Sequence, residues 1–207
     1  MKRIVVATKN PGKIREMTMA FRELPVELVA LASFGSLPDA VEDGATFAAN
    51  AEIKARFYMQ ATGVACLADD SGLEVEALGG APGVYSARFA GYHADDAANN
   101  AKLLSELGGL VGEERAAHFT CCLVLAAPNT ESLFVQAECP GQIATLPAGE
   151  SGFGYDPLFL VPEYGKTFAE LGMEIKNKIS HRARAIEMLV GKWEKWTHEL
   201  NQTEESL

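Results

Sequence analysis

Three carboxylates lie where they could hold a metal ion. Asp69 and Asp70 follow Val64–Ala68, an apolar run typical of a buried strand, and Glu42 precedes a predicted helix. Adjacent side chains on a strand point to opposite faces, so only one of the two neighbours needs to enter a cleft. Mg²⁺ takes few carboxylates and completes its shell with waters and phosphates. From these residues alone, a magnesium site and an acidic turn between strands are equally supported.

A second group of residues could hold an anion. The segment Thr8–Lys13 joins a strand-like apolar run to a segment of helical periodicity. Asn10 suits the N-cap of that helix, and Pro11 suits its first position. The amides of Gly12 and Lys13 are then expected to point outward, where a helix start can bind an anion. A well-capped turn with a surface lysine explains the same residues, and the Walker A glycine pattern is absent.

Two further segments carry aromatic and basic side chains. Gly152–Pro157 places two aromatic rings and an acid in a glycine-rich loop. A loop aromatic can stack on a base, although a ring folded back onto the core is equally expected. Ser180 can cap a helix, which puts His181 and Arg182 in a first turn where the helix dipole disfavours positive charge. We therefore favour an arrangement in which these basic side chains face acceptor atoms of a ligand. The alternative is that they are exposed on the surface beside a capping serine.

Periodicity and turn residues predict the elements that must position these groups. Strands are predicted at Ile4–Ala7, Glu27–Leu31, Val64–Ala68, His118–Ala127 and Leu133–Gln142, the last two as a hairpin. Helices are predicted at Ile14–Leu24, from a Thr46 cap to about Thr62, at Asp95–Leu107 and after Ser180. Ser71 and Gly72 predict a tight turn after the third strand, and Pro147–Pro157 predicts a loop. The strand, turn and helix at the start open an α/β fold.

Asn50 and Lys54 form a polar pair on the second predicted helix. They are four residues apart and therefore share a helix face. The polar edge of an amphipathic helix is the favoured interpretation, unless the structure places Lys54 near the acids.

Composition and charge exclude several classes of protein. The chain has 207 residues, of which 48% are hydrophobic and 22% charged, as in an ordinary globular domain. A net charge of 18 − 28 = −10 argues against a nucleic-acid binder, and no apolar run is long enough to span a membrane. Basic clusters at residues 1–24 and 176–184 flank an acidic one at residues 39–76. The four cysteines lack metal-ligand spacing, so we expect buried thiols in a cytoplasmic protein.

Seven motifs, in order along nearly the whole chain, resemble those of the inosine triphosphate pyrophosphatase family. They are Thr8–Lys13; Glu42, Gly44 and Thr46–Phe47; Asn50–Arg56; Asp69–Gly72; Leu78–Arg88; Gly152–Pro157; and Ile179–Arg182. The resemblance implies an α/β fold with an elongated mixed β-sheet, flanking helices and two lobes around a central cleft. It implies one such domain over residues 1–198, followed by a polar tail at residues 199–207.

The resemblance also implies an activity. Members of this family hydrolyse deaminated purine nucleotides (ITP, dITP, XTP) with Mg²⁺ and so remove them from the nucleotide pool. Water cleaves between the α- and β-phosphates, which releases a nucleoside monophosphate and pyrophosphate. The implied partners are the purine nucleoside triphosphate and, in a homodimer, a second copy of the chain, with no nucleic acid and no membrane.

Residue roles follow from the motif positions. The resemblance implies Asp70 as the general base and a metal ligand, Glu42 as a second metal ligand, and Asp69 close to the ion. The substrate-binding residues that it implies are Thr8, Lys9, Asn10, Pro11, Gly12, Lys13, Lys54, Ser71, Phe153, Gly154, Tyr155, Asp156, Lys176, His181 and Arg182. Lys9 and Ala183 depart from the common family pattern, which leaves the substrate preference open.

Two other functions remain open. A pyrophosphatase for modified pyrimidine nucleotides shares the fold, but the segments Phe153–Asp156 and Ser180–Arg182 count against it. A nucleotide-binding sensor that has lost catalysis belongs to another class of protein. The acids at the end of the third strand, together with Lys13, argue against an inactive site.

Overall fold

The computed structural model describes residues 2–22, 24–91 and 95–198. The predicted polar tail at residues 199–207 lies outside this part of the chain. No helix in the described ranges is long and apolar enough to cross a membrane. The chain forms two compact units: unit 1 comprises Met1–Asp70, Cys121–Gln136 and Arg184–Leu207, and unit 2 comprises Ser71–Thr120 and Ala137–Ala183. One domain over residues 1–198 stays a prediction.

The strands belong to a seven-stranded mixed sheet with the order β2-β1-β3-β4-β5-β6-β7. They are β1 (Lys2–Val6), β2 (Val26–Ala30), β3 (Cys66–Val75), β4 (Ala116–Ala126), β5 (Leu133–Ile143), β6 (Phe159–Val161) and β7 (Lys166–Thr167). Strand β1 pairs in parallel with both β2 and β3, whereas β6 pairs antiparallel with β5 and β7. This confirms the predicted mixed sheet, and the predicted β4 and β5 are neighbours in it.

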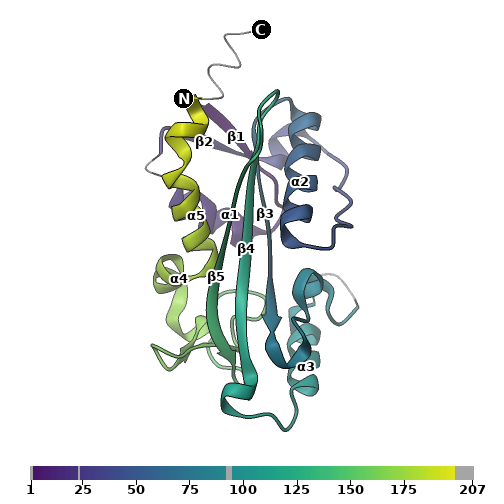
Figure 1. Ribbon diagram of the computed structural model, residues 1–207, viewed down its shortest axis with the longest axis vertical. Helices are drawn as coiled ribbons and strands as arrows, with labels where there is room; N and C mark the ends of the chain where they lie inside the picture. The colour runs from purple at the N-terminus through teal and green to yellow at the C-terminus, as the bar shows by residue number, and fades with distance from the viewer. Residues whose placement is uncertain (1, 23, 92–94, 199–207) are drawn as a thin grey trace. The chain divides into compact units, whose positions relative to one another are not determined.

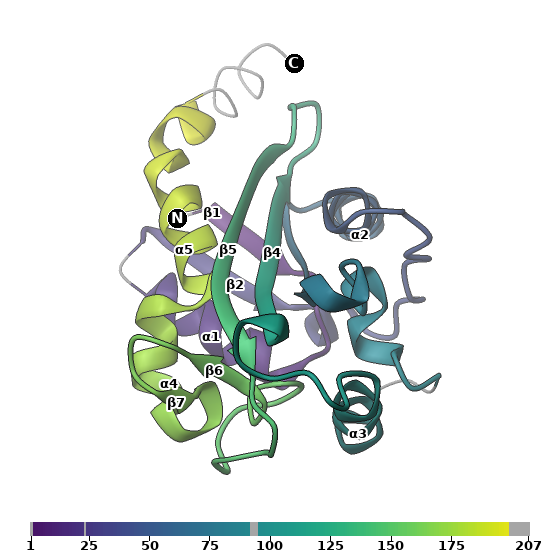
Figure 2. The ribbon, with the colours of Figure 1, turned by 60° about the horizontal axis from the view of Figure 1, so that its bottom comes forward.

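The α-helices that flank these strands in the described part of the chain include α1 (Pro11–Ala20), α2 (Phe47–Thr62), α3 (Asp96–Glu106), α4 (Phe168–Ile179) and α5 (His181–Gly191). Short 3₁₀ turns occupy Leu31–Phe34, Glu76–Leu78, Gly83–Arg88 and Gly112–Arg115. In unit 1, α2 and most of α5 lie on opposite sides of the strands (Figures 1 and 2). The apolar run of β1 is buried because helices cover both faces of this part of the sheet.

The predicted helix caps are present in the structure. The Thr46 hydroxyl accepts a hydrogen bond from the amide of Ala49 at 3.1 Å, and α2 begins at the next residue after Thr46. Ser180 caps α5 in the same way, because its Oγ accepts from the amide of Ala183 at 3.2 Å. These caps fix the starts of the two helices that carry Lys54 and Arg182.

The core of unit 2 is aromatic. The ring of Phe119 on β4 lies 4.6 Å from that of Phe159 on β6, and the ring of Phe159 lies 4.9 Å from that of Phe168 on α4. All three side chains are buried. The glycine-rich segment Gly152–Pro157 precedes β6 directly, as the sequence predicted, so this aromatic cluster anchors the C-terminal end of that loop.

One sequence expectation about the elements was wrong, and one helix was missed. The predicted tight turn at Ser71 and Gly72 does not form, because β3 continues through both residues to Val75. Strand β1 pairs with β3 only at Cys66 and Leu67, so the neighbour of β3 beyond these residues is β4, and pairing in the sheet outweighs the local turn preference. Helix α4 was not predicted, although Thr167 and Glu170 form a capping box at its start.

Candidate active site

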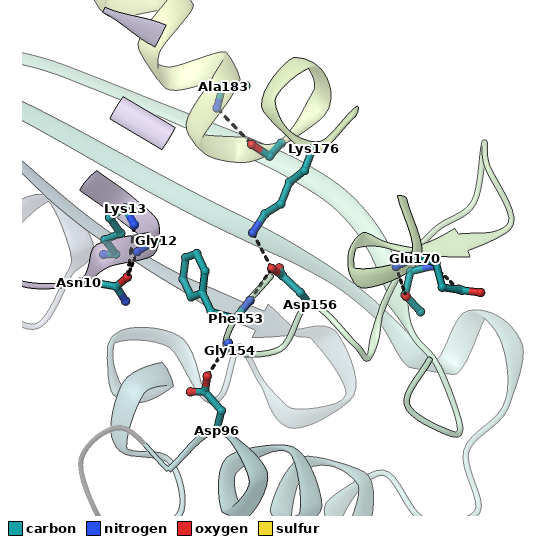
Figure 3. A network of polar contacts seen from close by, with 12 residues as sticks. Asn10, Gly12, Lys13, Asp96, Phe153, Gly154, Asp156, Glu170, Lys176 and Ala183 are labelled. Atoms are coloured by element: carbon teal, nitrogen blue, oxygen red, sulfur yellow. Dashed lines mark hydrogen bonds and ion pairs between the residues drawn. The ribbon is translucent and has the colours of Figure 1, made fainter. Parts of the chain in front are cut away.

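In the loop before α1, the Asn10 side chain is the N-cap. Its Oδ1 accepts hydrogen bonds from the amides of Gly12 at 2.8 Å and Lys13 at 3.2 Å (Figure 3). The Asn10 amide in turn donates to the Thr8 hydroxyl at 3.1 Å. The amides of Gly12 and Lys13 therefore do not point outward as expected, because the cap uses the same donors that an anion would use. At this loop the positive charge for an anion would therefore come from lysine side chains such as that of Lys13.

Asp69 is fully enclosed by partners from unit 1. Its Oδ1 forms an ion pair with the ammonium of Lys13, and its Oδ2 accepts from the Cys121 thiol at 3.4 Å. The Asp69 side chain is 0% exposed. Both carboxylate oxygens of Asp69 thus have protein partners. Asp69 therefore holds Lys13 in place. The role of Asp69 beside a metal ion stays a prediction.

Lys54 lies close to the acidic residues. The sequence analysis made this proximity the condition for giving Lys54 a role in the site rather than on the polar edge of a helix. Its ammonium contacts Glu42 Oε2 at 2.6 Å and the backbone oxygen of Asp69 at 3.2 Å. Helix α2 places it there because the Thr46 cap fixes the start of the helix and Lys54 follows two turns later. Lys54 therefore links the loop of Glu42 to the strand that carries Asp69.

Asp70 is the unsatisfied carboxylate of this cluster. The residue is half-buried, and its Oδ2 is inaccessible and has no hydrogen-bond partner among the described residues. Burial raises the pKa of Asp70 above its ordinary value of 3.8, while the charges of Lys54 and Lys13 act in the opposite direction. The charges of Glu42 and Asp69 raise this pKa further. A buried acid of this kind is a candidate base, because proton transfer to it relieves the cost of its charge.

The cluster is suited to a cation that binds few protein ligands. Two lysines and three carboxylates give it a net charge of 2 − 3 = −1. Among the described residues, no group of three or more His, Cys, Asp or Glu side chains is arranged to hold a metal. Asp69 is enclosed by its own partners, so the candidate ligands are Glu42, which pairs with Lys54, and Asp70, whose Oδ2 has no hydrogen-bond partner among the described residues. Two carboxylates suffice for Mg²⁺ when substrate phosphates complete its shell.

A buried amide holds the loop that carries Glu42. The Oδ1 of Asn50, which is 2% exposed, accepts from the amide of Gly44 at 2.8 Å. A Cβ added at Gly44 would lie 2.8 Å from both Asn50 Oδ1 and the Cβ of Ala49. Position 44 therefore requires glycine, because the backbone there packs directly against the first turn of α2. This contact sets the position of Glu42.

Replacing Gly44 by Ala is expected to destabilise the protein by about 1–3 kcal/mol, since the loop must move away from α2 to make room. Urea unfolding measures the change in the free energy of unfolding. The matched control is Gly191→Ala, because a Cβ at Gly191 meets nothing within 4 Å and its φ is ordinary. That variant should be neutral or slightly more stable. Equal stability of the Gly44 and Gly191 variants would contradict the close packing.

Lys9 has a partner away from the acidic cluster. Its ammonium pairs with Asp39 at 2.5 Å, and both side chains are more than half exposed. Thr8 and Lys9 also line a cavity of about 340 Å³, together with Leu31, Leu37 and Tyr58. Contact of Lys9 with phosphate therefore stays a prediction, as it does for Thr8.

In unit 2, Asp156 organises the glycine-rich loop. Its Oδ2 contacts the ammonium of Lys176 at 2.6 Å and accepts from the amide of Phe153 at 3.0 Å (Figure 3). The Lys176 ammonium also lies 4.5 Å from the centre of the Phe153 ring, which is a cation–π contact. Gly152 lies so close to Asp156 that a Cβ there would come within 2.1 Å of the carboxylate. This network fixes the Phe153 ring, which is only half-buried.

His181 and Arg182 are not surface residues. They are 3% and 2% exposed, which excludes the alternative of exposed basic neighbours. The His181 ring stacks on Phe119 with a centroid distance of 4.7 Å and an interplanar angle of 17°. The Tyr155 hydroxyl donates to the backbone oxygen of Ser86 at 2.9 Å, and burial raises the pKa of Tyr155. The predicted base-binding segments are thus brought together within unit 2.

Two residues that the sequence analysis missed contact this loop. Asp96 Oδ2 accepts from the amide of Gly154 at 2.7 Å, and Asn100 donates to the Gly154 oxygen at 2.9 Å. Both lie on α3, four residues apart, which is the only signal that the sequence offers. The remaining predicted residue, Ser71, is half-buried on β3 in unit 2.

Known proteins resemble this chain over almost its full length. A sequence model of the Ham1 family matches residues 4–192. A protein of Geobacillus kaustophilus named dITP/XTP pyrophosphatase is 52% identical, with 94% of this chain and 95% of that protein covered. A protein of Geobacter sulfurreducens with the same name is 51% identical, with coverage of 91% and 95%. These names agree with the family that the sequence motifs suggested.

Solved structures agree with the fold. The HAM1 protein of Coxiella burnetii has a TM-score of 0.86 and 42% identity, with 94% of this chain and 100% of that chain covered. The Ham1 protein of Staphylococcus aureus has a TM-score of 0.84 and 41% identity, with coverage of 94% and 99%. By sequence and by fold, this chain belongs to the Ham1 family.

Proposed function

We propose that this protein is a hydrolase of phosphoric anhydrides that converts dITP, XTP and ITP to the monophosphate and pyrophosphate with Mg²⁺. The observation that carries the proposal is Asp70, a carboxylate with a raised pKa and an unsatisfied buried oxygen beside two lysines. The names of the relatives at about 50% identity support the purine substrates over modified pyrimidine nucleotides. They also count against a sensor without catalysis.

Asp70 is the base in this proposal. Its carboxylate takes a proton from a water molecule while the water oxygen forms a bond to phosphorus. The bond between that phosphorus and the oxygen that bridges the α- and β-phosphates breaks, and its electron pair leaves with pyrophosphate. The raised pKa of Asp70 brings its basicity closer to neutral pH, which favours this transfer.

Lys13 and Lys54 neutralise phosphate charge. Both now pair with carboxylates, Lys13 with Asp69 and Lys54 with Glu42. A bound triphosphate offers these ammonium groups a denser negative charge, so each shifts towards phosphate oxygens without leaving unit 1. Glu42 and Asp70 would hold Mg²⁺, which when bound supplies charge stabilisation on the phosphate oxygens.

Base selectivity is assigned to unit 2. Hypoxanthine and xanthine present an oxygen at C6 where adenine presents an amino group. The guanidinium of the buried Arg182 carries only donors, to which such an oxygen is a suitable acceptor and an amino group is not. A mismatch of two donors costs binding energy, so adenine nucleotides should bind poorly. The half-buried Phe153 ring is placed to stack on the base.

The test is a comparison of kcat/KM with Mg²⁺ for XTP, dITP and ITP against ATP, GTP and dTTP. We expect the three deaminated purine nucleotides to exceed ATP by at least about 100-fold, as expected for discrimination by a buried polar group. Preference for dTTP or another pyrimidine nucleotide would contradict the assignment of the base. Binding of ITP without turnover of any substrate would support the sensor.

A homodimer and a cytoplasmic location are also part of the proposal. The dimer comes from the family resemblance, and the location comes from the four cysteines, which are buried thiols. Light scattering on the purified protein tests the dimer. A monomer at micromolar concentration would contradict it.

A further inference from the structure

Helix α3 holds both polar backbone groups of Gly154. Asp96 Oδ2 accepts from the Gly154 amide, and Asn100 Nδ2 donates to the Gly154 oxygen (Figure 3 draws the first of these contacts). The two side chains are four residues apart and therefore project from the same face of α3. Gly154 has a φ of +62°, a conformation in which its peptide groups face away from the usual backbone directions. Its orientation is set by the two contacts from α3 and by one contact within the loop, in which the Asp156 amide donates to the Phe153 oxygen at 3.3 Å.

The start of α3 is itself well fixed. Asp95 is the N-cap, and its Oδ1 accepts from the amide of Ala98 at 2.8 Å. Asn99, which is 2% exposed, accepts from the amide of Ala90 at 2.7 Å and so ties the helix to the segment before it. Asp96 comes directly after the cap, where the helix dipole favours a carboxylate. The helix therefore presents Asp96 and Asn100 from a rigid frame.

Every other residue of the segment Phe153–Asp156 is held differently. The Phe153 amide is bound by Asp156, and the Tyr155 hydroxyl is bound by the Ser86 oxygen. Gly154 lies between these two anchors. The peptide that joins Phe153 to Gly154 is bound at both of its polar groups: Asp96 accepts from its amide, and the amide of Asp156 donates to its oxygen at 3.3 Å. Of these two contacts, the one with Asp96 comes from outside the loop.

We propose that Asp96 and Asn100 are positioning residues that set the affinity and selectivity for the nucleobase by fixing the peptide groups of Gly154. This inference rests on the proposed function, in which Phe153–Asp156 contact the base. Both contacts lie within unit 2, in the loop to which recognition of the base is assigned, so we expect their effect on that recognition. A merely structural role would instead lower stability and leave base affinity unchanged.

The test uses the full chain and four variants. Asp96→Ala and Asn100→Ala each remove one contact to Gly154. Asp96→Asn keeps a carbonyl oxygen that can accept from the same amide. Asp95→Ala is the matched control, because it removes the neighbouring carboxylate that caps α3 without touching the loop. Steady-state kinetics with ITP, XTP and GTP are combined with calorimetric binding of IMP and of tripolyphosphate.

Asp96→Ala should raise KM for ITP and weaken IMP binding about fivefold, because a charge-assisted hydrogen bond at an exposed carboxylate is lost. The kcat value and tripolyphosphate binding should change less than about twofold, the pattern of lost uniform binding. The ratio of GTP to ITP turnover should rise. Asn100→Ala should act in the same direction, and Asp96→Asn should recover most of the loss.

Three results would overturn the inference. The first is an unchanged KM and IMP affinity in both alanine variants. The second is an equal loss in Asp95→Ala, which would assign the effect to the helix. The third is loss of tripolyphosphate binding together with IMP binding, which would indicate general damage. If the unmodified protein turns over neither ITP nor XTP, the proposed function fails first, and the inference falls with it.

Discussion

Replacing Asp70 by Asn is expected to lower kcat for ITP about a thousandfold while the variant still binds the nucleotide. The amide keeps the shape of the side chain but cannot accept the proton from water. The matched control is Asp43→Asn, the same chemical change at an exposed carboxylate beside Glu42. Full turnover by the Asp70 variant would remove Asp70 from the role of base.

The same substitution should stabilise the protein when a chelator has removed divalent ions. Burial raises the pKa of Asp70 in the folded state, so the folded protein binds the proton more tightly than the unfolded chain does. Above the ordinary value of 3.8 the unfolded chain ionises first, and stability falls as the pH rises through the folded pKa. The cost of the Asp70 charge therefore grows as the pH rises, and Asp70→Asn removes it. The gain, on the order of 1 kcal/mol, should shrink as the pH falls.

Urea unfolding at neutral pH and at mildly acidic pH measures this difference. A variant less stable than the unmodified protein at neutral pH would mean that the Asp70 carboxylate has stabilising partners in the folded state. Such a result would contradict the unsatisfied Oδ2 on which the assignment of the base depends.

Replacing Asp156 by Ala is expected to destabilise the protein by about 3–5 kcal/mol. The change leaves the ammonium of Lys176, whose side chain is 3% exposed, without its carboxylate partner. It also removes the acceptor for the Phe153 amide. A double variant that also carries Lys176→Met should regain part of the lost stability. Replacing both members of a buried ion pair costs less free energy of unfolding than removing one member and leaving the other charge buried. Urea unfolding of the single and double variants measures both effects.

An exposed pair on the same helix provides the control. Lys178 and Glu174 lie 3.2 Å apart with side chains that are 68% and 87% exposed. Glu174→Ala should change stability by no more than about 0.5 kcal/mol. If Asp156→Ala were as mild as this control, the pair with Lys176 would contribute little to the base-binding loop.

The sequence alone predicts the parts of this fold that local chemistry decides. The caps at Thr46 and Ser180 and the strand at the N-terminus follow from residue types within a few positions. The continuation of β3 through Ser71 and Gly72 does not, because its neighbours in the sheet impose it. Tertiary contacts overrode turn preference there.

The candidate site likewise has residues that the sequence predicts and contacts that only the structure shows. The motifs identified Asp70 and Asp156, but only the structure shows that Lys54 contacts Glu42 and that the amides of Gly12 and Lys13 are already bound. Contacts of Asp96 with a loop 58 positions away leave no pattern in a single sequence. Side chains that act across long sequence separations are found only once the chain is folded.

The central claim is that Asp70 and its neighbours direct water to cleave between the α- and β-phosphates. The most direct measurement is to resolve the products of ITP turnover with Mg²⁺ by ion-exchange chromatography, for the unmodified protein and for Asp70→Asn. We predict IMP and pyrophosphate in equal amounts from the unmodified protein and neither product, at matched times, from the variant. Release of orthophosphate and IDP, or equal turnover by both proteins, would contradict the account.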